Sequence, residues 1–325
     1  MSTIGSQSSI LLDGEYLIYQ DMSFSKSQSN KIAILGATGY GGIQLVRLLK
    51  DHPFFKITFL GGDRTAGQKW NDLFPFINLD FDPIIQKINI KEILEVSDYV
   101  ILSLPNGIAS QILPKLLVEN IKIIDLSADY RYKSLDIWKQ VYSTEDEKYN
   151  RSDYDICHTF TYGLTEWNRE LITKSNCVSC PGCFPTSALL GVLPFLKQGL
   201  IETEGIIIDS KTGTSGGGRI PKEHLLLSES SEAISAYGVI GHRHTSEIEQ
   251  FATQVSGHSI ELQFTPHLVP MVRGILSTIY SRLRDPGLTA DDCRTLLDSF
   301  YRNDPFIEVL KVGIYPSTKW VKNTN

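Results

Sequence analysis

The sequence has no long apolar run and no excess of positive charge. Among its 325 residues, no apolar stretch approaches the roughly 20 residues that a membrane-spanning helix needs. The formal net charge is −6, from 31 lysine and arginine residues against 37 aspartate and glutamate residues. These absences argue against binding to a membrane or to nucleic acid, and they favour an ordinary globular protein.

Cysteine is scarce, and its number is odd, because only five cysteines occur: Cys157, Cys177, Cys180, Cys183 and Cys293. A chain of this length can bury a core without disulfides, so the pattern predicts a protein of the reducing cytoplasm. Three of the cysteines have C-x2-C-x2-C spacing, which leaves a zinc or iron–sulfur protein as an alternative. The fourth position of the ferredoxin spacing is Ser187. We therefore expect no metal.

The chain divides by pattern into an N-terminal extension and two domains. Residues 1–30 lack the parts of a signal peptide and are expected to be loose, with a short hairpin at 10–19. Residues 31–183 contain apolar runs at 31–35, 56–60, 99–104 and 121–126, and a helical pattern at 41–50. These features predict an α/β fold with a Rossmann-type parallel sheet. Residues 184–310 predict a smaller α+β domain with a largely antiparallel or mixed sheet, whose strands we expect at 205–209, 260–264 and 274–282.

A glycine-rich loop joins the first predicted strand to the first predicted helix. Its glycines allow the backbone to approach a pyrophosphate at a helix N-terminus, where N–H groups attract an anion. The loop therefore predicts dinucleotide binding, because it has the required strand before it and helix after it. The candidate cofactor-binding residues of this loop are Gly36, Thr38, Gly39, Tyr40, Gly41 and Gly42.

Two further loops are expected to contact the dinucleotide. After the second strand, Asp63 suits the 2′-hydroxyl of NAD and Arg64 suits the 2′-phosphate of NADP, so local chemistry leaves both open. After the third strand, Asn106 lies in a Pro-Asn-Gly turn and is expected to lie along the cofactor. Arg131 follows the fourth strand and is placed either to bind an anion or to pair with an aspartate, Asp125 or Asp129.

Cys183 lies where another helix is predicted to begin. Gly182 permits a sharp turn before it, and Pro185 suits the first helical position because it has no N–H to leave unpaired. Unpaired N–H groups and the positive end of the helix dipole favour a thiolate. On this local pattern Cys183 is either an activated nucleophile or a buried thiol packed on the helix, since free cysteines are often buried.

Seven segments occur in the order found in the N-acetyl-γ-glutamyl-phosphate reductase family, which the chain resembles from about Lys31 to Asn325. They are GATGYGG from Gly36, DLSADYR ending at Arg131, YGLTE from Tyr162, PGCFPT around Cys183, DSKTGTSGGGR ending at Arg219, GHRHTSEIEQ from Gly241 and FTPHLVPMVRG from Phe264. Aspartate-semialdehyde dehydrogenase is a related family, and it is less similar in the HRH and PHLVPM segments.

The resemblance implies an NADP-dependent enzyme of arginine biosynthesis that converts an acyl phosphate to a semialdehyde and inorganic phosphate. Cys183 matches the family's catalytic position and would form a thioester. His242 or His244 is the candidate acid/base, since histidine titrates near neutral pH. Arg131 and Arg219 become candidates for the substrate's phosphate and carboxylate. A homo-oligomer, either a dimer or a tetramer, is also expected, and aspartyl phosphate or a carrier-linked acyl phosphate stays open as the substrate.

Two expectations concern the C-terminal half. Ser246 and Glu249 have capping-box spacing, so both histidines are expected in a loop just before a helix. Residues 311–325 end in TKWVKNTN, which resembles a family segment that normally continues to a helix on the cofactor domain. We therefore expect this C-terminal return to be cut short and NADP binding to be weakened.

Overall fold

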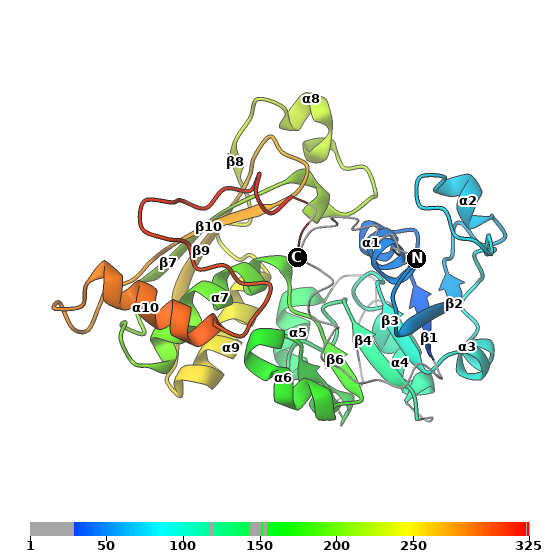
Figure 1. Cartoon of the computed structure of the whole chain (residues 1–325), viewed down its shortest axis with the longest axis horizontal. Helices are drawn as coiled ribbons and strands as arrows, with labels where there is room; N and C mark the ends of the chain where they lie inside the picture. Colours follow the sequence, from blue (N-terminus) through cyan, green and yellow to red (C-terminus); the bar gives the residue numbers. More distant parts are fainter. Residues whose placement is uncertain (1–28, 118–119, 144–150, 152–154, 323, 325) are drawn as a thin grey trace, which may run out of the picture.

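The computed structural model describes residues 29–117, 120–143, 151, 155–322 and 324. The hairpin predicted at 10–19 lies outside these residues. The described chain forms two sheets with their helices (Figure 1). No helix in these ranges is long and apolar enough to cross a membrane.

The first sheet has six parallel strands in the order β2-β1-β3-β4-β6-β5. The strands are β1 (Asn30–Leu35), β2 (Phe55–Gly61), β3 (Tyr99–Leu102), β4 (Lys122–Asp125), β5 (Thr161–Tyr162) and β6 (Cys177–Ser179). Its helices are α1 (Tyr40–Leu49), α2 (Trp70–Leu73), α3 (Ile90–Val96), α4 (Ala109–Leu116), α5 (Leu135–Tyr142) and α6 (Thr165–Lys174). The four predicted strands and the predicted first helix are confirmed.

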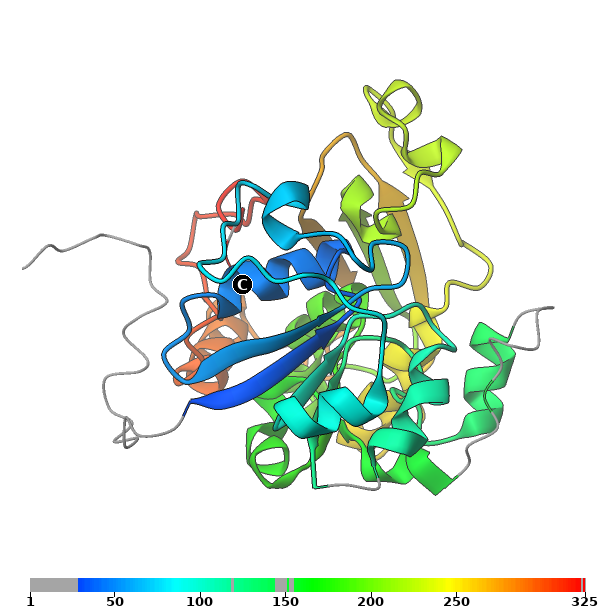
Figure 2. The same ribbon diagram turned by 90° about the vertical axis from the view of Figure 1, so that its right-hand side faces the viewer.

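Both faces of this sheet are covered, which explains why its strands read as continuous apolar runs. Side chains alternate along β1, so Ile32 and Ile34 pack in one cluster with Val46 of α1. Ala33 and Leu35 of β1 pack in another cluster with Leu113 of α4. Figure 2 shows α1 above the strands and the helices α3 and α4 below them.

The second sheet is mixed, as predicted, with the order β10-β7-β9-β8. Strands β7 and β9 are parallel, whereas β10 and β8 pair antiparallel with their neighbours. The elements are β7 (Ile206–Thr212), β8 (Ser235–Ala236), β9 (Leu262–Leu268), β10 (Ile275–Tyr280), α7 (Cys183–Lys197), α8 (Leu227–Ser230), α9 (His244–Ser256) and α10 (Ala290–Tyr301). A capping box at Thr289 starts α10.

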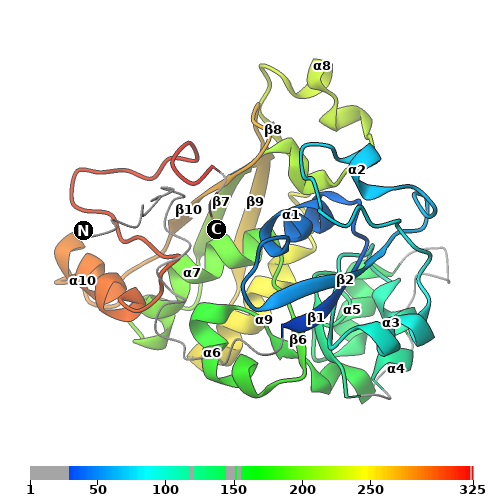
Figure 3. The same cartoon turned by 45° about the vertical axis from the view of Figure 1, so that its right-hand side comes forward.

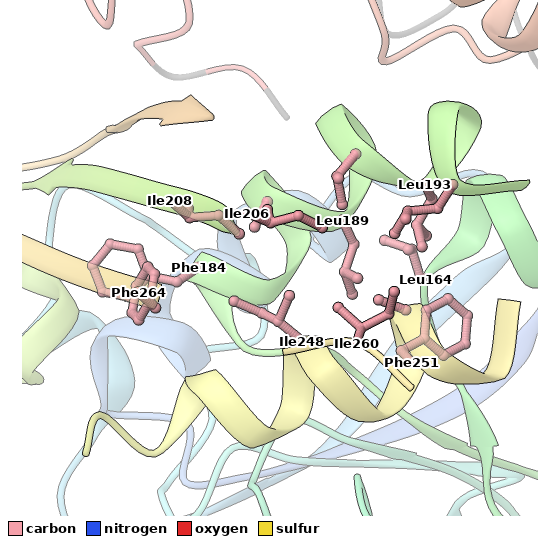
Figure 4. Close-up of a cluster of buried hydrophobic side chains, with 14 of the residues drawn as sticks. Leu164, Phe184, Leu189, Leu193, Ile206, Ile208, Ile248, Phe251, Ile260 and Phe264 are labelled. Atoms are coloured by element: carbon pink, nitrogen blue, oxygen red, sulfur yellow. The ribbon is translucent and has the colours of Figure 1, made fainter. Parts of the chain in front are cut away.

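A single apolar core holds α7 and α9 against this sheet. Leu189 and Leu193 of α7 face Ile248 and Phe251 of α9 (Figure 4). Each such fully buried side chain contributes about 1.5–3 kcal/mol relative to an exposed one. Leu164, just beyond β5, belongs to the same core. The core therefore joins the edge of the first sheet to the second domain.

Candidate active site

Cys183 is the first residue of α7, as the sequence predicts. Gly182 is the N-cap residue, and no side chain caps the helix. The first turn carries no acidic residue. Pro185 is the third helical residue rather than the first, a position where the N–H still has no partner within the helix. The N–H groups of this first turn therefore face the thiol.

The predicted thiolate is not favoured in the folded protein. Cys183 keeps a solvent-exposed surface. Groups packed around it nevertheless desolvate the charged form, and this raises the pKa of Cys183. The N–H groups of Phe184 and Cys183 and the positive charge of Arg131 lower the pKa, as the helix position predicts, but they offset only part of the rise. Cys183 therefore needs a base to become a nucleophile.

His244 begins α9, so it lies inside the helix and the prediction of a preceding loop is wrong for this residue. The predicted capping box is also absent. The hydroxyl of Ser246 lies 2.9 Å from that of Tyr132, and the Glu249 carboxylate accepts a hydrogen bond from Leu262 N–H at 3.2 Å. Both side chains have found partners distant in sequence, which local spacing cannot reveal.

The ring of His244 lies against the backbone just before Cys183. A Cβ atom added to Gly182 would lie only 2.6 Å from Nε2 of His244, so a side chain there would displace the ring. His244 N–H donates to Nδ1 of His242 at 3.1 Å, and the two ring centroids are 4.9 Å apart. The structure thus brings the His244 ring to the segment just before Cys183 and places the His242 ring beside it.

Aromatic side chains pack against the histidine pair. The His242 ring centroid lies 5.5 Å from that of Phe184 and 5.7 Å from that of Tyr237. Burial, followed by the charge of Arg243, lowers the pKa of His242 to about 4. Burial, followed by the charge of Arg131, lowers the pKa of His244 well below its usual 6.5. Both rings are therefore neutral at neutral pH.

Glu247 joins the elements of this site, and the sequence analysis gave it no role. Its carboxylate is fully buried and accepts hydrogen bonds from Gly182 N–H at 2.9 Å, Tyr162 Oη at 2.9 Å and Arg131 Nη1 at 3.2 Å. It lies three residues after His244 and therefore on the same face of α9. A glutamate one turn after a histidine was the available signal.

Arg131 is buried rather than on the surface, and its ion-pair partner is neither Asp125 nor Asp129. It pairs with Glu247, and it also donates to the carbonyl oxygens of Cys180 at 2.8 Å and Leu126 at 3.0 Å. The pairing predicted from neighbouring aspartates is therefore wrong. Its guanidinium holds together the loops that follow β4 and β6.

The glycine loop has the close approaches that a phosphate cradle requires. A Cβ atom added to Gly36 would lie 2.1 Å from the Ser103 carbonyl oxygen. A Cβ atom added to Gly42 would lie 2.2 Å from the Gly36 carbonyl oxygen. Gly36 also has a positive φ of 80°. The N-cap residue of α1 is Gly39, and neither a side-chain cap nor an acidic residue occupies this helix start. The free N–H groups therefore fit an anionic dinucleotide.

The other candidate cofactor loops lie beside this cradle. Thr65, next to the exposed Arg64, has its Oγ1 3.3 Å from Oγ1 of Thr38. Asn106 is half-buried and accepts a hydrogen bond from Ala128 N–H at 3.1 Å. Asp129, which was not predicted as a site residue, accepts from the N–H groups of Gly107 at 2.7 Å and Ser110 at 3.0 Å. These bonds lock the Asn106 turn to the loop that follows β4.

Arg219 lies at the cofactor loop rather than beside Cys183. Its Nη1 donates to the Thr38 carbonyl oxygen at 2.7 Å, and its guanidinium lies 5.3 Å over the Phe74 ring. Among the described residues, no contact joins it to Cys183 or to either histidine. The structure therefore separates the two arginines that the sequence grouped as substrate residues.

The three spaced cysteines do not gather around one point. Cys177 packs in the apolar core of the first sheet, whereas Cys183 is exposed at the start of α7. Within the described ranges, no three His, Cys, Asp or Glu side chains are grouped so as to hold a metal ion. The zinc or iron–sulfur alternative therefore has no structural support.

Comparisons with known proteins agree with this arrangement. Residues 31–175 match the family described as semialdehyde dehydrogenase, NAD binding domain, and residues 183–325 match semialdehyde dehydrogenase, dimerisation domain. The aspartate semialdehyde dehydrogenase II of Vibrio cholerae has a similar fold, with a TM-score of 0.64, 15% identity, and coverage of 90% of this chain and 84% of that one. The corresponding Candida albicans enzyme, solved with NADP, has a TM-score of 0.54 at 17% identity and covers 83% and 76% of the two chains.

A curated relative is much more similar in sequence. The N-acetyl-gamma-glutamyl-phosphate reductase of Prochlorococcus marinus is 63% identical over 304 residues, which cover 94% of this chain and 85% of the relative. The matched region extends across both domains of the chain. The chain belongs to the N-acetyl-gamma-glutamyl-phosphate reductase family.

Proposed function

We propose that the protein reduces N-acetyl-L-glutamyl 5-phosphate to N-acetyl-L-glutamate 5-semialdehyde and releases inorganic phosphate, a step of arginine biosynthesis. The observation that carries the proposal is the contact of the His244 ring with Gly182, immediately before the exposed Cys183. A nucleophile beside a neutral base is what acyl transfer from an acyl phosphate requires. The name of the Prochlorococcus marinus relative supports this choice of substrate.

The first half of the reaction forms a thioester. His244 is the better candidate base, because its ring reaches the segment just before Cys183. Nδ1 of His242 already accepts a hydrogen bond from the backbone N–H of His244. It takes the thiol proton, and the sulfur attacks the carbonyl carbon of the acyl phosphate. The bond between that carbon and the phosphate oxygen breaks, and phosphate leaves. Free N–H groups at the start of α7 stabilise the negative charge on the carbonyl oxygen.

In the second half, the thioester is reduced. The dinucleotide, when bound, supplies the hydride that the carbonyl carbon receives. His244 then gives its proton to the resulting oxyanion, which forms a thiohemiacetal on Cys183. It takes that hydroxyl proton back as the carbon–sulfur bond breaks, so the aldehyde leaves and the thiol is restored. Nδ1 of His244 is buried and has no hydrogen-bond partner among the described residues.

We assign NADP as the cofactor, held by the glycine loop, Arg64 and the Asn106 turn. The exposed guanidinium of Arg64 after β2 suits a 2′-phosphate, and the similarly folded Candida albicans enzyme was solved with NADP. Arg131 contributes positive charge that stabilises the Cys183 thiolate. Its contact with the substrate's phosphate or carboxylate stays a prediction.

We further assign residues 31–183 to cofactor binding and residues 184–310 to catalysis and dimerisation. The match to a dimerisation domain supports a homodimer, and a tetramer would be a dimer of such dimers. All five cysteines are free thiols, which agrees with a reducing cytoplasm.

An assay in the reverse direction tests the function. Purified protein is mixed with N-acetylglutamate semialdehyde, phosphate and NADP, and NADPH absorbance is followed. In parallel assays, aspartate semialdehyde replaces N-acetylglutamate semialdehyde, and NAD replaces NADP. We expect phosphate-dependent NADPH formation with the acetylated substrate. Faster turnover of aspartate semialdehyde would instead support the related dehydrogenase reaction.

A further inference from the structure

Arg219 reaches from the second domain to the glycine loop of the first. It lies 181 residues from Thr38 in sequence, yet its Nη1 donates to the Thr38 carbonyl oxygen at 2.7 Å. Its guanidinium also lies 5.3 Å over the Phe74 ring, which limits where the head group can turn. Figure 3 shows α1, which begins just after Thr38, on the side of the first domain that faces the second sheet.

The backbone that carries Arg219 is fixed. The preceding loop is anchored by Thr214 N–H and Ser215 N–H, which donate to the carbonyl oxygens of Met271 and Val272 at 3.0 Å each. Gly218 has a φ of 85°, a conformation that favours glycine, and it turns the chain immediately before Arg219. These contacts anchor the loop that precedes Arg219 to the second domain.

Most of the guanidinium's hydrogen-bonding capacity is unused. Arg219 is exposed, and within the described residues its single hydrogen bond is the one to Thr38. An arginine has five N–H donors. Several donors therefore remain beside a helix N-terminus that has no side-chain cap and no acidic residue in its first turn. Positive charge from Arg219 adds to the attraction of this helix start for an anion.

We propose that Arg219 binds the phosphate groups of the dinucleotide, so that the second domain closes the cofactor site, and that it is not a substrate ligand. The inference rests on the proposed use of a dinucleotide. Its chemical basis is the forked guanidinium, which matches a phosphate and already sits on the cradle. Two phosphate positions are available to it, the diphosphate and the 2′-phosphate of NADPH.

Fluorescence titration of the full-length protein with NADPH and NADH tests the proposal. We expect Arg219→Gln to raise the Kd for NADPH about 10- to 100-fold, the effect of losing charge-assisted hydrogen bonds. The Kd of Arg219→Lys for NADPH should lie between those of Arg219→Gln and the parent, because lysine keeps the charge but lacks the forked guanidinium donors. If Arg219→Gln binds NADH and NADPH equally more weakly, Arg219 contacts the diphosphate. If only NADPH binding is weakened, Arg219 contacts the 2′-phosphate. Both results support the proposal.

Arg284→Gln is the matched control, because Arg284 is a partly exposed arginine of the second domain paired with Glu202 at 3.4 Å. It should bind both dinucleotides as the parent does. An unchanged Kd in Arg219→Gln, with either a higher KM for the acyl phosphate or only a lower melting temperature, would overturn the proposal. A parent protein that binds no dinucleotide would overturn it too. The titration does not require turnover. If Arg219→Gln binds NADPH more weakly than the parent but the parent reduces no acyl phosphate, only the proposed substrate is refuted.

Discussion

Replacing Glu247 with glutamine tests whether one buried carboxylate organises the site. Glutamine keeps the shape and one acceptor oxygen, so the hydrogen bonds from Tyr162 Oη and Gly182 N–H, each 2.9 Å long, can persist. The substitution removes the negative charge that balances Arg131 at 3.2 Å. It therefore isolates the electrostatic contribution of Glu247 from its packing.

The structure sets the expected magnitude. The side chain of Arg131 is only 9% exposed and that of Glu247 is 0% exposed, so water cannot replace the lost partner. Leaving a buried charge without its partner costs about 3–5 kcal/mol. We expect the free energy of unfolding of Glu247→Gln to fall by about this amount in urea denaturation. Glu247→Ala should lose more, because two further buried donors lose their acceptor.

A second measurement separates positioning of Cys183 from general stability. The negative charge of Glu247 raises the pKa of Cys183, and the positive charge of Arg131 lowers it. In Glu247→Gln the arginine acts unopposed, so the pH midpoint for iodoacetamide alkylation of Cys183 should move to lower pH. Tandem mass spectrometry locates the label on Cys183 from fragment ions, because Cys177 and Cys180 lie in the same tryptic peptide.

Glu249→Gln is the control for both measurements. Glu249 is half-buried on the same helix, and it accepts a hydrogen bond from Leu262 N–H rather than from Arg131. Glu249→Gln should lower the free energy of unfolding less than Glu247→Gln does, and it should leave the pH midpoint for Cys183 alkylation unchanged. A stability loss below about 1 kcal/mol in Glu247→Gln, together with an unchanged midpoint, would refute the assignment of Glu247 as a positioning residue.

Three further predictions concern the nucleophile, the cofactor and pH. Cys183→Ser should abolish turnover while NADPH binding and urea stability stay near those of the parent, and Cys177→Ser should retain activity; equal loss in both would contradict a single nucleophile. Arg64→Ala should weaken NADPH more than NADH by about 1–3 kcal/mol in a binding titration; a parent protein that prefers NADH would show that the cofactor is wrongly assigned. The pKa of His242 falls from 6.5 to about 4 on folding, so the unfolded chain binds more protons between these values. The free energy of unfolding should therefore fall as pH is lowered through this window, and it should fall less in His242→Gln; identical pH slopes in calorimetry would count against this.

Much of the first domain could be predicted from local sequence. Strands buried on both faces are continuous apolar runs, and a glycine-rich turn between a strand and a helix has few alternative structures. The start of α7 at Cys183 was likewise signalled by Gly182 and Pro185. These features depend on residues that are neighbours in the chain, so spacing alone identified them.

The chemistry of the site was decided by contacts between distant residues. Arg131 pairs with Glu247, 116 residues away, although two aspartates are close to it in sequence. Groups packed around the exposed Cys183 thiol desolvate its charged form and raise its pKa, which opposes the effect expected from a helix N-terminus. Local sequence thus determined which groups are present and where helices begin. Only the tertiary structure decided their charge states and partners, because desolvation and pairing depend on every element that packs around a group.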